Sequence, residues 1–230
     1  MKMPHLKIMV IAAHPDDEIL GCGASIARMQ KQGAEISTLI AAEGLTSRIQ
    51  PGDKSDMRQN LLALQEIARK ANARMGCEKV KFLGFPDNAM DTISRLEIIR
   101  ALETEISNFK PSLILTHVDI DLNVDHQILH EAVLTAARPL PLSPVREIWG
   151  FEVPSATGWN FSRPAFSPNV FVDVADSFDQ KMLALRDYDS EMRPYPHARS
   201  YEAIEALAKY RGTQVGVPKA EAFTLIRQII

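Results

Sequence analysis

The stretch KIMVIAAHPDDE, residues 7–18, predicts both the fold class and the place of a functional site. Its first half, Lys7 to Ala12, is a short apolar run typical of a strand buried in a sheet. Its second half, from His14 to Glu18, brings one imidazole and three carboxylates together directly after that strand. Ligands bind outside the carboxyl ends of the strands in open parallel sheets. We therefore expect a site at the end of this first strand.

Outward from this stretch, short apolar runs alternate with longer amphipathic segments. The expected strands span residues 7–12, 35–41, 79–83, 113–116, 147–153 and 170–174. The expected helices span residues 18–32, 55–75, 94–109, 125–137, 176–191 and 201–212. Ser55 is the expected N-cap of the second helix, and two helices are expected to close the chain. This order predicts the α/β class, with a mostly parallel sheet covered by helices on both faces. No linker or repeat divides the chain, so we expect residues 1–230 to form a single domain.

Composition and charge argue against several classes of protein. The formal net charge is -3, the pI is about 6.1, and Lys and Arg form no cluster, so no nucleic-acid partner is expected. The N-terminal apolar run is too short to cross a bilayer, and no small-residue cleavage site follows it. Neither a membrane span nor a cleaved leader is therefore expected. Cys22 and Cys77 make no disulfide framework, which favours a reducing, cytoplasmic location.

The acidic turn after the first strand favours a bound cation. One imidazole and three carboxylates would be costly to desolvate in a packed loop without a positive charge. Mixed histidine and carboxylate ligation suits zinc. The alternative is a solvated helix N-terminus, where acidic residues are favoured, and this alternative applies best to Glu18.

A second polar cluster, HVDIDLNVDH at residues 117–126, follows the expected strand 113–116. Two strands that end at the same edge of a sheet let their loops converge on one crevice. His126 is therefore a candidate for the third metal ligand, and Asp125 for a group that orients a ligand or a base. His130 shares a helical face with His126, but simple packing within the helix is an equally good interpretation of it.

These motifs resemble the PIG-L/LmbE family of zinc-dependent N-acetyl deacetylases. The resemblance rests on AHPDDE at residues 13–18 followed, after a long interval, by DH at residues 125–126. It extends to EGLTSR at 43–48, GFPDN at 84–88, PHARS at 196–200 and EAF at 221–223, and so covers nearly the whole chain. The family implies a Rossmann-like fold. The GxGxxG fingerprint is absent after the first strand, however, so dinucleotide binding is not expected.

The resemblance also implies a site and a reaction. His14, Asp17 and His126 would hold one Zn²⁺ per chain, with another divalent ion such as Fe²⁺ as the alternative, and Asp16 matches the general base. The implied reaction is hydrolysis of an N-acetyl group on a small amino-sugar-type substrate by metal-activated water. The sugar would be free, nucleotide-linked or lipid-linked, and the family implies a homo-oligomer. Two alternatives stay open: an amide hydrolase for a non-sugar or thiol-conjugate substrate, and a metal- or ligand-binding protein without catalysis.

The second motif departs from the family pattern at one position. Many members have His-Pro-Asp-His, where the first His helps to stabilise the tetrahedral oxyanion, but residues 123–126 of this chain are NVDH. Asn123 can donate a hydrogen bond from its amide but cannot carry positive charge. We therefore expect another residue to supply a second donor. His197 is the preferred candidate because it lies in a proline-bounded segment, and His117 is the competitor.

Four further residues are candidates for substrate binding. Arg48 is expected to contact a substrate hydroxyl or phosphate, the alternative being a solvated loop arginine. Asp87 is expected to contact sugar hydroxyls, although Pro-Asp-Asn is also an ordinary turn sequence. Glu152, at the end of an expected strand, is expected to line the crevice together with Glu221.

Overall fold

The computed structural model describes residues 6–48 and 57–230, and the expected α/β architecture is confirmed within them. The strands are β1 (Lys7–Ala12), β2 (Glu35–Ala42), β3 (Lys79–Phe85), β4 (Leu113–His117), β5 (Glu147–Phe151), β6 (Val170–Asp173) and β7 (Ala220–Gln228). The helices are α1 (Asp17–Lys31), α2 (Met57–Arg74), α3 (Arg95–Phe109), α4 (Val124–Ala136), α5 (Phe178–Asp187) and α6 (Tyr201–Thr213). Ser55, the expected N-cap of α2, lies outside the described residues.

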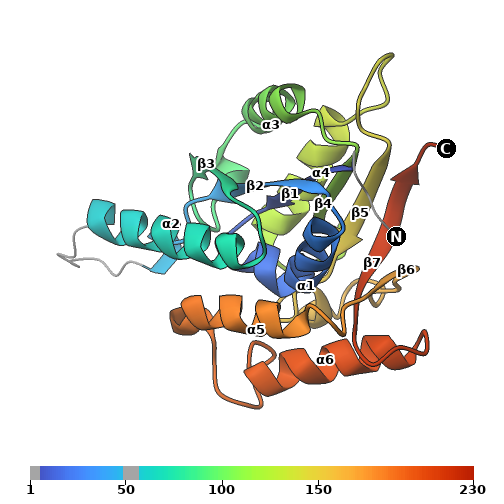
Figure 1. Cartoon of the computed structure of the whole chain (residues 1–230). Coiled ribbons are helices and arrows are strands. Elements are labelled where there is room, and N and C mark those ends of the chain that lie inside the picture. Colours follow the sequence, from blue (N-terminus) through green and yellow to red (C-terminus); the bar gives the residue numbers. More distant parts are fainter. Residues whose placement is uncertain (1–5, 49–56) are drawn as a thin grey trace.

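The described strands form one sheet in the order β3-β2-β1-β4-β5-β7-β6 (Figure 1). Neighbouring strands from β3 to β5 are parallel, whereas β7 runs antiparallel to both β5 and β6. β1 has β2 on one side and β4 on the other, so the order of the strands reverses at this point. In open α/β sheets such a reversal opens a crevice beyond the carboxyl ends of the strands. The loops after β1 and β4 carry the two polar motifs to this crevice.

Helices cover both faces of the sheet, as expected (Figure 1). Alternate residues of a strand point to opposite faces, and β1 shows the consequence. Ile8 and Val10 pack in the core under α1, α2, α5 and α6, whereas Met9 and Ile11 pack in the core under α3 and α4. Burying an aliphatic side chain of this size contributes about 1.5–3 kcal/mol, so β1 is firmly anchored and the turn that follows it starts from a fixed point. In the described ranges, no helix is both long and apolar enough to cross a membrane.

The C-terminal part of the chain differs from the expectation in two ways. The last element is strand β7, so the prediction that two helices close the chain is wrong. β7 is held by pairing with β5 and β6, segments far from it along the chain, and local periodicity carries little information about such pairing. Helix α5 also ends at Asp187, and Asp189–Glu191 forms a separate 3-10 turn instead of continuing the helix.

Candidate metal centre

The turn between β1 and α1 carries the first polar motif into the crevice. β1 ends at Ala12 and α1 begins at Asp17. Between them, Asp16 has a backbone φ of 114°, a conformation that residues other than glycine rarely adopt. Backbone strain of this kind persists only where the surrounding structure holds the residue in place. Such residues are found mainly at functional sites.

Glu18 supports this turn from within the protein. Its Oε2 accepts the N–H of Asp16 at 3.0 Å, and its Oε1 accepts from Asn72 Nδ2 at 2.9 Å and from the Tyr188 hydroxyl at 2.8 Å. Glu18 is fully buried, and burial raises its pKa to about 7. The alternative interpretation of Glu18 as a solvated helix-terminal acid is therefore wrong.

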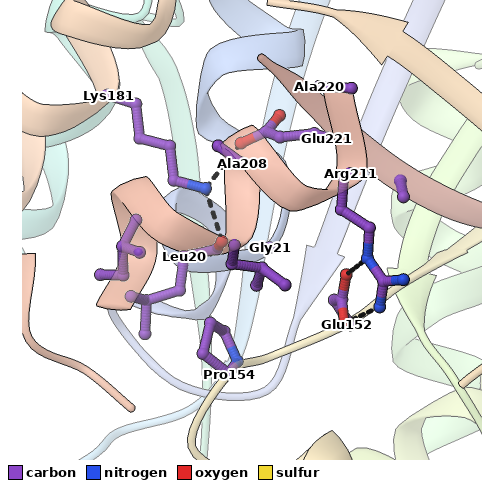
Figure 2. A pocket seen from close by; sticks show the side chains of 12 residues that line it. Leu20, Gly21, Glu152, Pro154, Lys181, Ala208, Arg211, Ala220 and Glu221 are labelled. Carbon is purple, nitrogen blue, oxygen red and sulfur yellow. Dashed lines mark hydrogen bonds and ion pairs between the residues drawn. The ribbon is translucent and has the colours of Figure 1, made fainter. Parts of the chain in front are cut away.

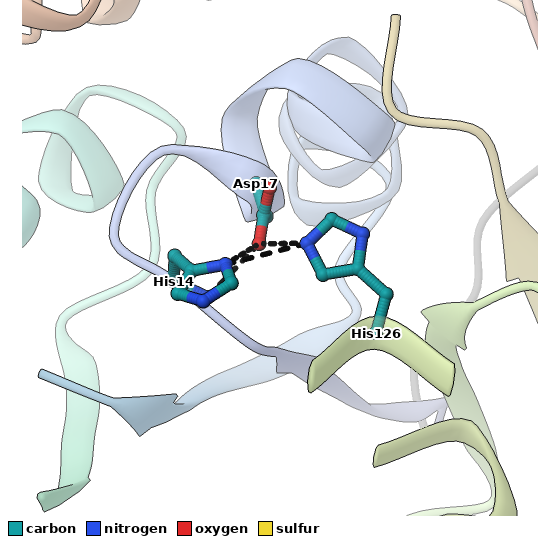
Figure 3. A group of neighbouring side chains, drawn as sticks. All are labelled: His14, Asp17 and His126. Carbon is teal, nitrogen blue, oxygen red and sulfur yellow. Dashed lines mark hydrogen bonds and ion pairs between the residues drawn. The ribbon is translucent and has the colours of Figure 1, made fainter. Parts of the chain in front are cut away.

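Nδ1 of His14, Oδ2 of Asp17 and Nε2 of His126 form a triangle, which we call the ligand triangle (Figure 3). The distances are 3.2 Å from His14 Nδ1 to Asp17 Oδ2, 3.1 Å from Asp17 Oδ2 to His126 Nε2, and 3.3 Å between the two nitrogens. A tetrahedral zinc ion with bonds of about 2.0–2.1 Å keeps its ligand atoms about 3.4 Å apart. The three atoms therefore fit a divalent cation, and three protein ligands leave a fourth position open.

The acidic surroundings favour positive charge at the ligand triangle. Burial opposes protonation of His14, but the carboxylates of Asp125 and Asp17 outweigh it and raise the His14 pKa to about 10. Burial is likewise outweighed at His126, where Asp17 and Asp121 raise the pKa to about 9. The pKa of Asp17 lies well below its usual range, because the effect of the histidines exceeds that of burial. A divalent cation would supply the positive charge that protonation of His14 and His126 otherwise brings. The charges around the ligand triangle therefore favour a cation, as its distances do.

Each histidine of the ligand triangle has a carboxylate next to its other ring nitrogen. Oδ2 of Asp125 lies 3.0 Å from His14 Nε2, and Asp125 is held in turn by two backbone N–H groups within residues 88–90. Oδ2 of Asp121 lies 3.1 Å from His126 Nδ1. Carboxylates in this position fix the tautomer and the orientation of metal-binding histidines.

The ligand triangle opens into a polar cavity of about 160 Å³. Most of its lining side chains can donate or accept hydrogen bonds, so it suits a polar ligand better than an apolar one. The described lining residues are His14, Asp16, Asp17, Asp87, Asn88, Asn123, His126, Val153, Ser155, Ala156 and Arg199.

Asp16 lines this cavity beside the ligand triangle. Its Oδ2 accepts a hydrogen bond from Nη1 of Arg199 at 3.0 Å. Burial raises the pKa of Asp16 well above its usual value and the charge of Asp17 adds to this rise, while Arg199 opposes it. A carboxyl group whose pKa moves towards neutrality can both take a proton from water and give it back. Asp16 has the position and the chemistry that a general base needs.

Asn123 is the N-cap of α4. Its Oδ1 accepts the N–H of Asp125 at 2.8 Å and that of His126 at 3.3 Å, so it fixes the start of the helix that carries His126. Its Nδ2 donates to Oδ1 of Asn88 at 2.8 Å. An amide has two N–H donors, so this contact leaves one of them for a ligand in the cavity.

The two histidines that the sequence offers as further donors have other contacts. His117 stacks on His126 with ring centroids 3.8 Å apart, and its Nε2 accepts the N–H of Ala13 at 2.9 Å. Burial lowers the pKa of His117 well below its usual value, so the ring is neutral. His197 Nδ1 accepts the N–H of Arg199 at 3.0 Å. Neither histidine is among the described residues that line the cavity.

Of the substrate-binding candidates, Asp87 lies in the cavity. Its Oδ1 is 3.3 Å from His14 Nε2, and its Oδ2 accepts from the N–H of Ser47 at 3.3 Å and from the hydroxyl of the same residue. Arg48 belongs to the 3-10 turn Thr46–Arg48, but its side chain is outside the described part of the structure. The prediction for Arg48 therefore stays a prediction.

Glu152 and Glu221 line a second cavity instead (Figure 2). Nε and Nη2 of Arg211 each donate to the Glu152 carboxylate at 2.8 Å, so this carboxylate is engaged within the protein. Glu221 accepts from Lys181 Nζ at 2.6 Å and from two backbone N–H groups in the middle of α1. The placement of both glutamates differs from the sequence expectation, because both line this second cavity and neither is among the described residues that line the cavity at the ligand triangle.

The sequence assigns no role to two residues of the site, Asp121 and Arg199. Asp121 is fully buried next to His126, and its Oδ2 accepts a hydrogen bond from the hydroxyl of Thr157 at 2.7 Å. It belongs to the second polar cluster, but nothing in the sequence distinguishes it from the exposed Asp119. Arg199 lies in the PHARS segment, yet its contact with Asp16 joins opposite ends of the chain. Only proximity in three dimensions identifies these two residues.

Comparison with known proteins shows which family the chain is similar to. A family model described as PIG-L: GlcNAc-PI de-N-acetylase matches residues 9–137. The uncharacterized deacetylase YaiS of Escherichia coli K12 is 31% identical over 189 residues, which cover 80% of this chain and 90% of the relative. A diacetylchitobiose deacetylase of Thermococcus kodakarensis is 25% identical over 229 residues, covering 96% of this chain and 83% of the relative.

Among solved structures, GalB, the 4-carboxy-2-hydroxymuconate hydratase of Pseudomonas putida KT2440, superposes with a TM-score of 0.79. The two sequences are 19% identical, and the superposition covers 98% of each chain. This likeness concerns the fold alone. One fold hosts different reactions, so the function has to be argued from the site.

Proposed function

The chain belongs to the PIG-L family, and we propose that it is a metal-dependent hydrolase that removes an N-acetyl group from an amino-sugar-type substrate. One observation carries the proposal: Asp16 lines the same cavity as three ligand atoms that lie 3.1–3.3 Å apart. A protein that only binds a metal needs the ligand triangle but has no use for a base beside it. The sugar substrate is supported by the diacetylchitobiose deacetylase among the relatives.

His14, Asp17 and His126 are the residues that would hold the cation. We assign Zn²⁺, with Fe²⁺ as the alternative, because both accept mixed histidine and carboxylate ligands. When bound, the cation supplies Lewis-acid chemistry that activates water and polarises the acetamide carbonyl. Asp125 and Asp121 keep the two imidazoles oriented for this task.

Asp16 takes a proton from the attacking water and returns it to the departing amine. The water oxygen first forms a bond to the acetyl carbon, and the C–N bond then breaks. The products are acetic acid, which ionises to acetate, and a free amine. The raised pKa of Asp16 suits both transfers, because a group that titrates nearer neutrality accepts and donates protons more evenly.

The remaining polar lining binds and orients the substrate. Asp87, Asn88 and Ser155 offer carboxylate, amide and hydroxyl groups, which match the hydroxyl groups of a sugar. We assign Asp87 to a substrate hydroxyl and the unused N–H of Asn123 to the acetamide oxygen. His197 as a second donor, the homo-oligomer and the cytoplasmic location stay predictions from the sequence.

The test is acetate release by the metal-loaded protein. The substrates are N-acetylglucosamine, diacetylchitobiose, nucleotide-linked and lipid-linked N-acetylglucosamine, and an N-acetylated amino acid as a non-sugar amide. We expect acetate from at least one sugar, its loss in Asp16→Asn, and its retention in the matched control Asp119→Asn, whose side chain is exposed.

Two results would contradict the proposal. Acetate from the non-sugar amide alone would favour the alternative amide hydrolase. No acetate from any compound, with metal bound to every chain, would favour a binding protein without catalysis.

A further inference from the structure

Arg199 reaches the cavity from a part of the chain remote from the ligand triangle. It lies in the segment between α5 and α6, directly before Ser200, the N-cap of α6. Its side chain lines the cavity, and its Nη1 donates to Oδ2 of Asp16 at 3.0 Å. The same nitrogen lies 3.8 Å from Oε2 of Glu191. The guanidinium therefore stands between two buried carboxylates, one of them the proposed base.

The backbone of Arg199 is fixed by its own segment. Its N–H donates to Nδ1 of His197 at 3.0 Å, and its carbonyl accepts the N–H of Arg193 at 3.3 Å. The hydroxyl of Ser200 accepts the N–H of Ala203 at 3.0 Å and ties the segment to α6. These bonds do not involve the turn that carries Asp16, so the arginine is held independently of its partner.

Asp16 is fixed from the other side. Its N–H is bound by Glu18, which is buried within the protein, and its backbone has the strained φ of 114°. The hydrogen bond to Arg199 engages Oδ2, and within the described ranges Oδ1 has no hydrogen-bonding partner. The contact therefore selects which oxygen is left for water in the cavity.

The charge balance gives this contact its strength. Asp16, Asp17 and Asp87 line the cavity, and among the described side chains that line it Arg199 alone is permanently charged with positive sign. A hydrogen bond whose donor or acceptor is ionised is roughly twice as strong as one between neutral groups. Arginine also stays protonated at any working pH, so the contact does not depend on a titration of Arg199.

We propose that Arg199 is a positioning residue that keeps Oδ1 of Asp16 directed at the reacting water. The proposal rests on the deacetylase function proposed above. According to this proposal, Arg199 affects turnover only through Asp16. A residue that binds the substrate or supports the fold would affect turnover without Asp16 as well.

The test is a double-mutant cycle with Arg199→Gln and Asp16→Asn, measured by acetate release from the best substrate of the panel. We expect Arg199→Gln to lower kcat by about 10- to 100-fold, with KM nearly unchanged, because a charge-assisted hydrogen bond to the base is lost. In the Asp16→Asn background, the same substitution should change kcat by less than about 3-fold, because coupled residues are not additive. Arg199→Lys should restore part of the activity.

Controls keep the result interpretable. Metal content and melting temperature of each variant should match those of the wild type, and Arg199→Lys serves as the second variant if Arg199→Gln folds poorly. The matched control is Arg193→Gln in the same segment, because the Arg193 guanidinium contacts only backbone carbonyls of Ser190 and Met192 in the described structure. It should keep wild-type turnover.

Equal losses from Arg199→Gln in both backgrounds would overturn this proposal, as would wild-type turnover in Arg199→Gln. A wild-type protein that binds metal but releases no acetate would overturn the proposed function, and this proposal with it.

Discussion

Nε2 of His126 lies 3.1 Å from Oδ2 of Asp17, although His126 is in the first turn of α4 and Asp17 is the first residue of α1. The contact follows from the sheet. β1 and β4 are adjacent and parallel, with Val10 opposite Leu115, so the loops after them leave the sheet at the same edge. The ligand triangle thus lies at the carboxyl ends of two buried strands, and regular elements of this kind position a site more precisely than loops do.

Metal content distinguishes the two histidines of α4. His126→Ala should lose most of the bound metal, because two remaining ligands do not complete a zinc site. His130→Ala is the matched control on the same helical face: its Nδ1 donates to the carbonyl of His117 at 2.8 Å, and we expect the variant to keep about one divalent ion per chain. Elemental analysis of protein loaded with excess zinc and then desalted measures this. Full metal content in His126→Ala would remove His126 from the ligand set.

The Asp16→Asn variant tests catalysis separately from metal binding. Asp16→Asn should keep its metal and lower turnover by about 10² to 10⁴-fold, the usual effect of removing a general base. Elemental analysis and acetate-release kinetics on the same preparation check both parts. Turnover equal to that of the wild type would exclude Asp16 from the mechanism.

Local patterns account for most of what the sequence predicts correctly. The strand Lys7–Ala12 is a continuous apolar run, and the acidic turn after it stands out because such a cluster is costly without a cation. The sequence does not predict β7, because its partner strands are distant in sequence and its own pattern, AEAFTLIRQ, does not alternate cleanly. The sequence does not predict the position of Glu152 either, because Arg211, which binds its carboxylate, lies on α6. A single sequence does not show which segments, remote from one another along the chain, come into contact.

Asp121 is a residue that only the structure identifies, and it offers a graded test of the metal site. Asp121→Asn should weaken zinc binding by about 10- to 100-fold, the usual cost of losing a carboxylate that orients a ligand histidine. Competition with a chromophoric chelator measures the affinity. Asp119→Asn, two residues away and exposed, should bind zinc like the wild type. Equal affinities in the two variants would show that Asp121 does not orient His126.

Substitution of His197 tests whether this residue is the second oxyanion donor that the sequence predicts. If it donates to the oxyanion, as the sequence suggests, His197→Ala lowers turnover by about 10² to 10³-fold, the usual cost of a lost oxyanion donor. In the structure, its Nδ1 accepts the N–H of Arg199 at 3.0 Å, and its ring meets the edge of Trp159 with centroids 5.4 Å apart. Within one chain, these contacts give His197 a supporting role: it holds the backbone of Arg199, whose side chain binds Asp16.

We therefore expect His197→Ala to lower turnover by less than about 10-fold, which is the range for losing one neutral hydrogen bond. His197→Asn is the matched variant, because an asparagine Oδ1 can accept the same N–H but cannot carry positive charge. Recovery of turnover in His197→Asn would indicate the supporting role, and metal content should stay unchanged in both variants. A loss of 10² to 10³-fold in both variants, with metal retained, would instead make His197 the missing donor and would require its imidazole to reach the acetamide oxygen during the reaction.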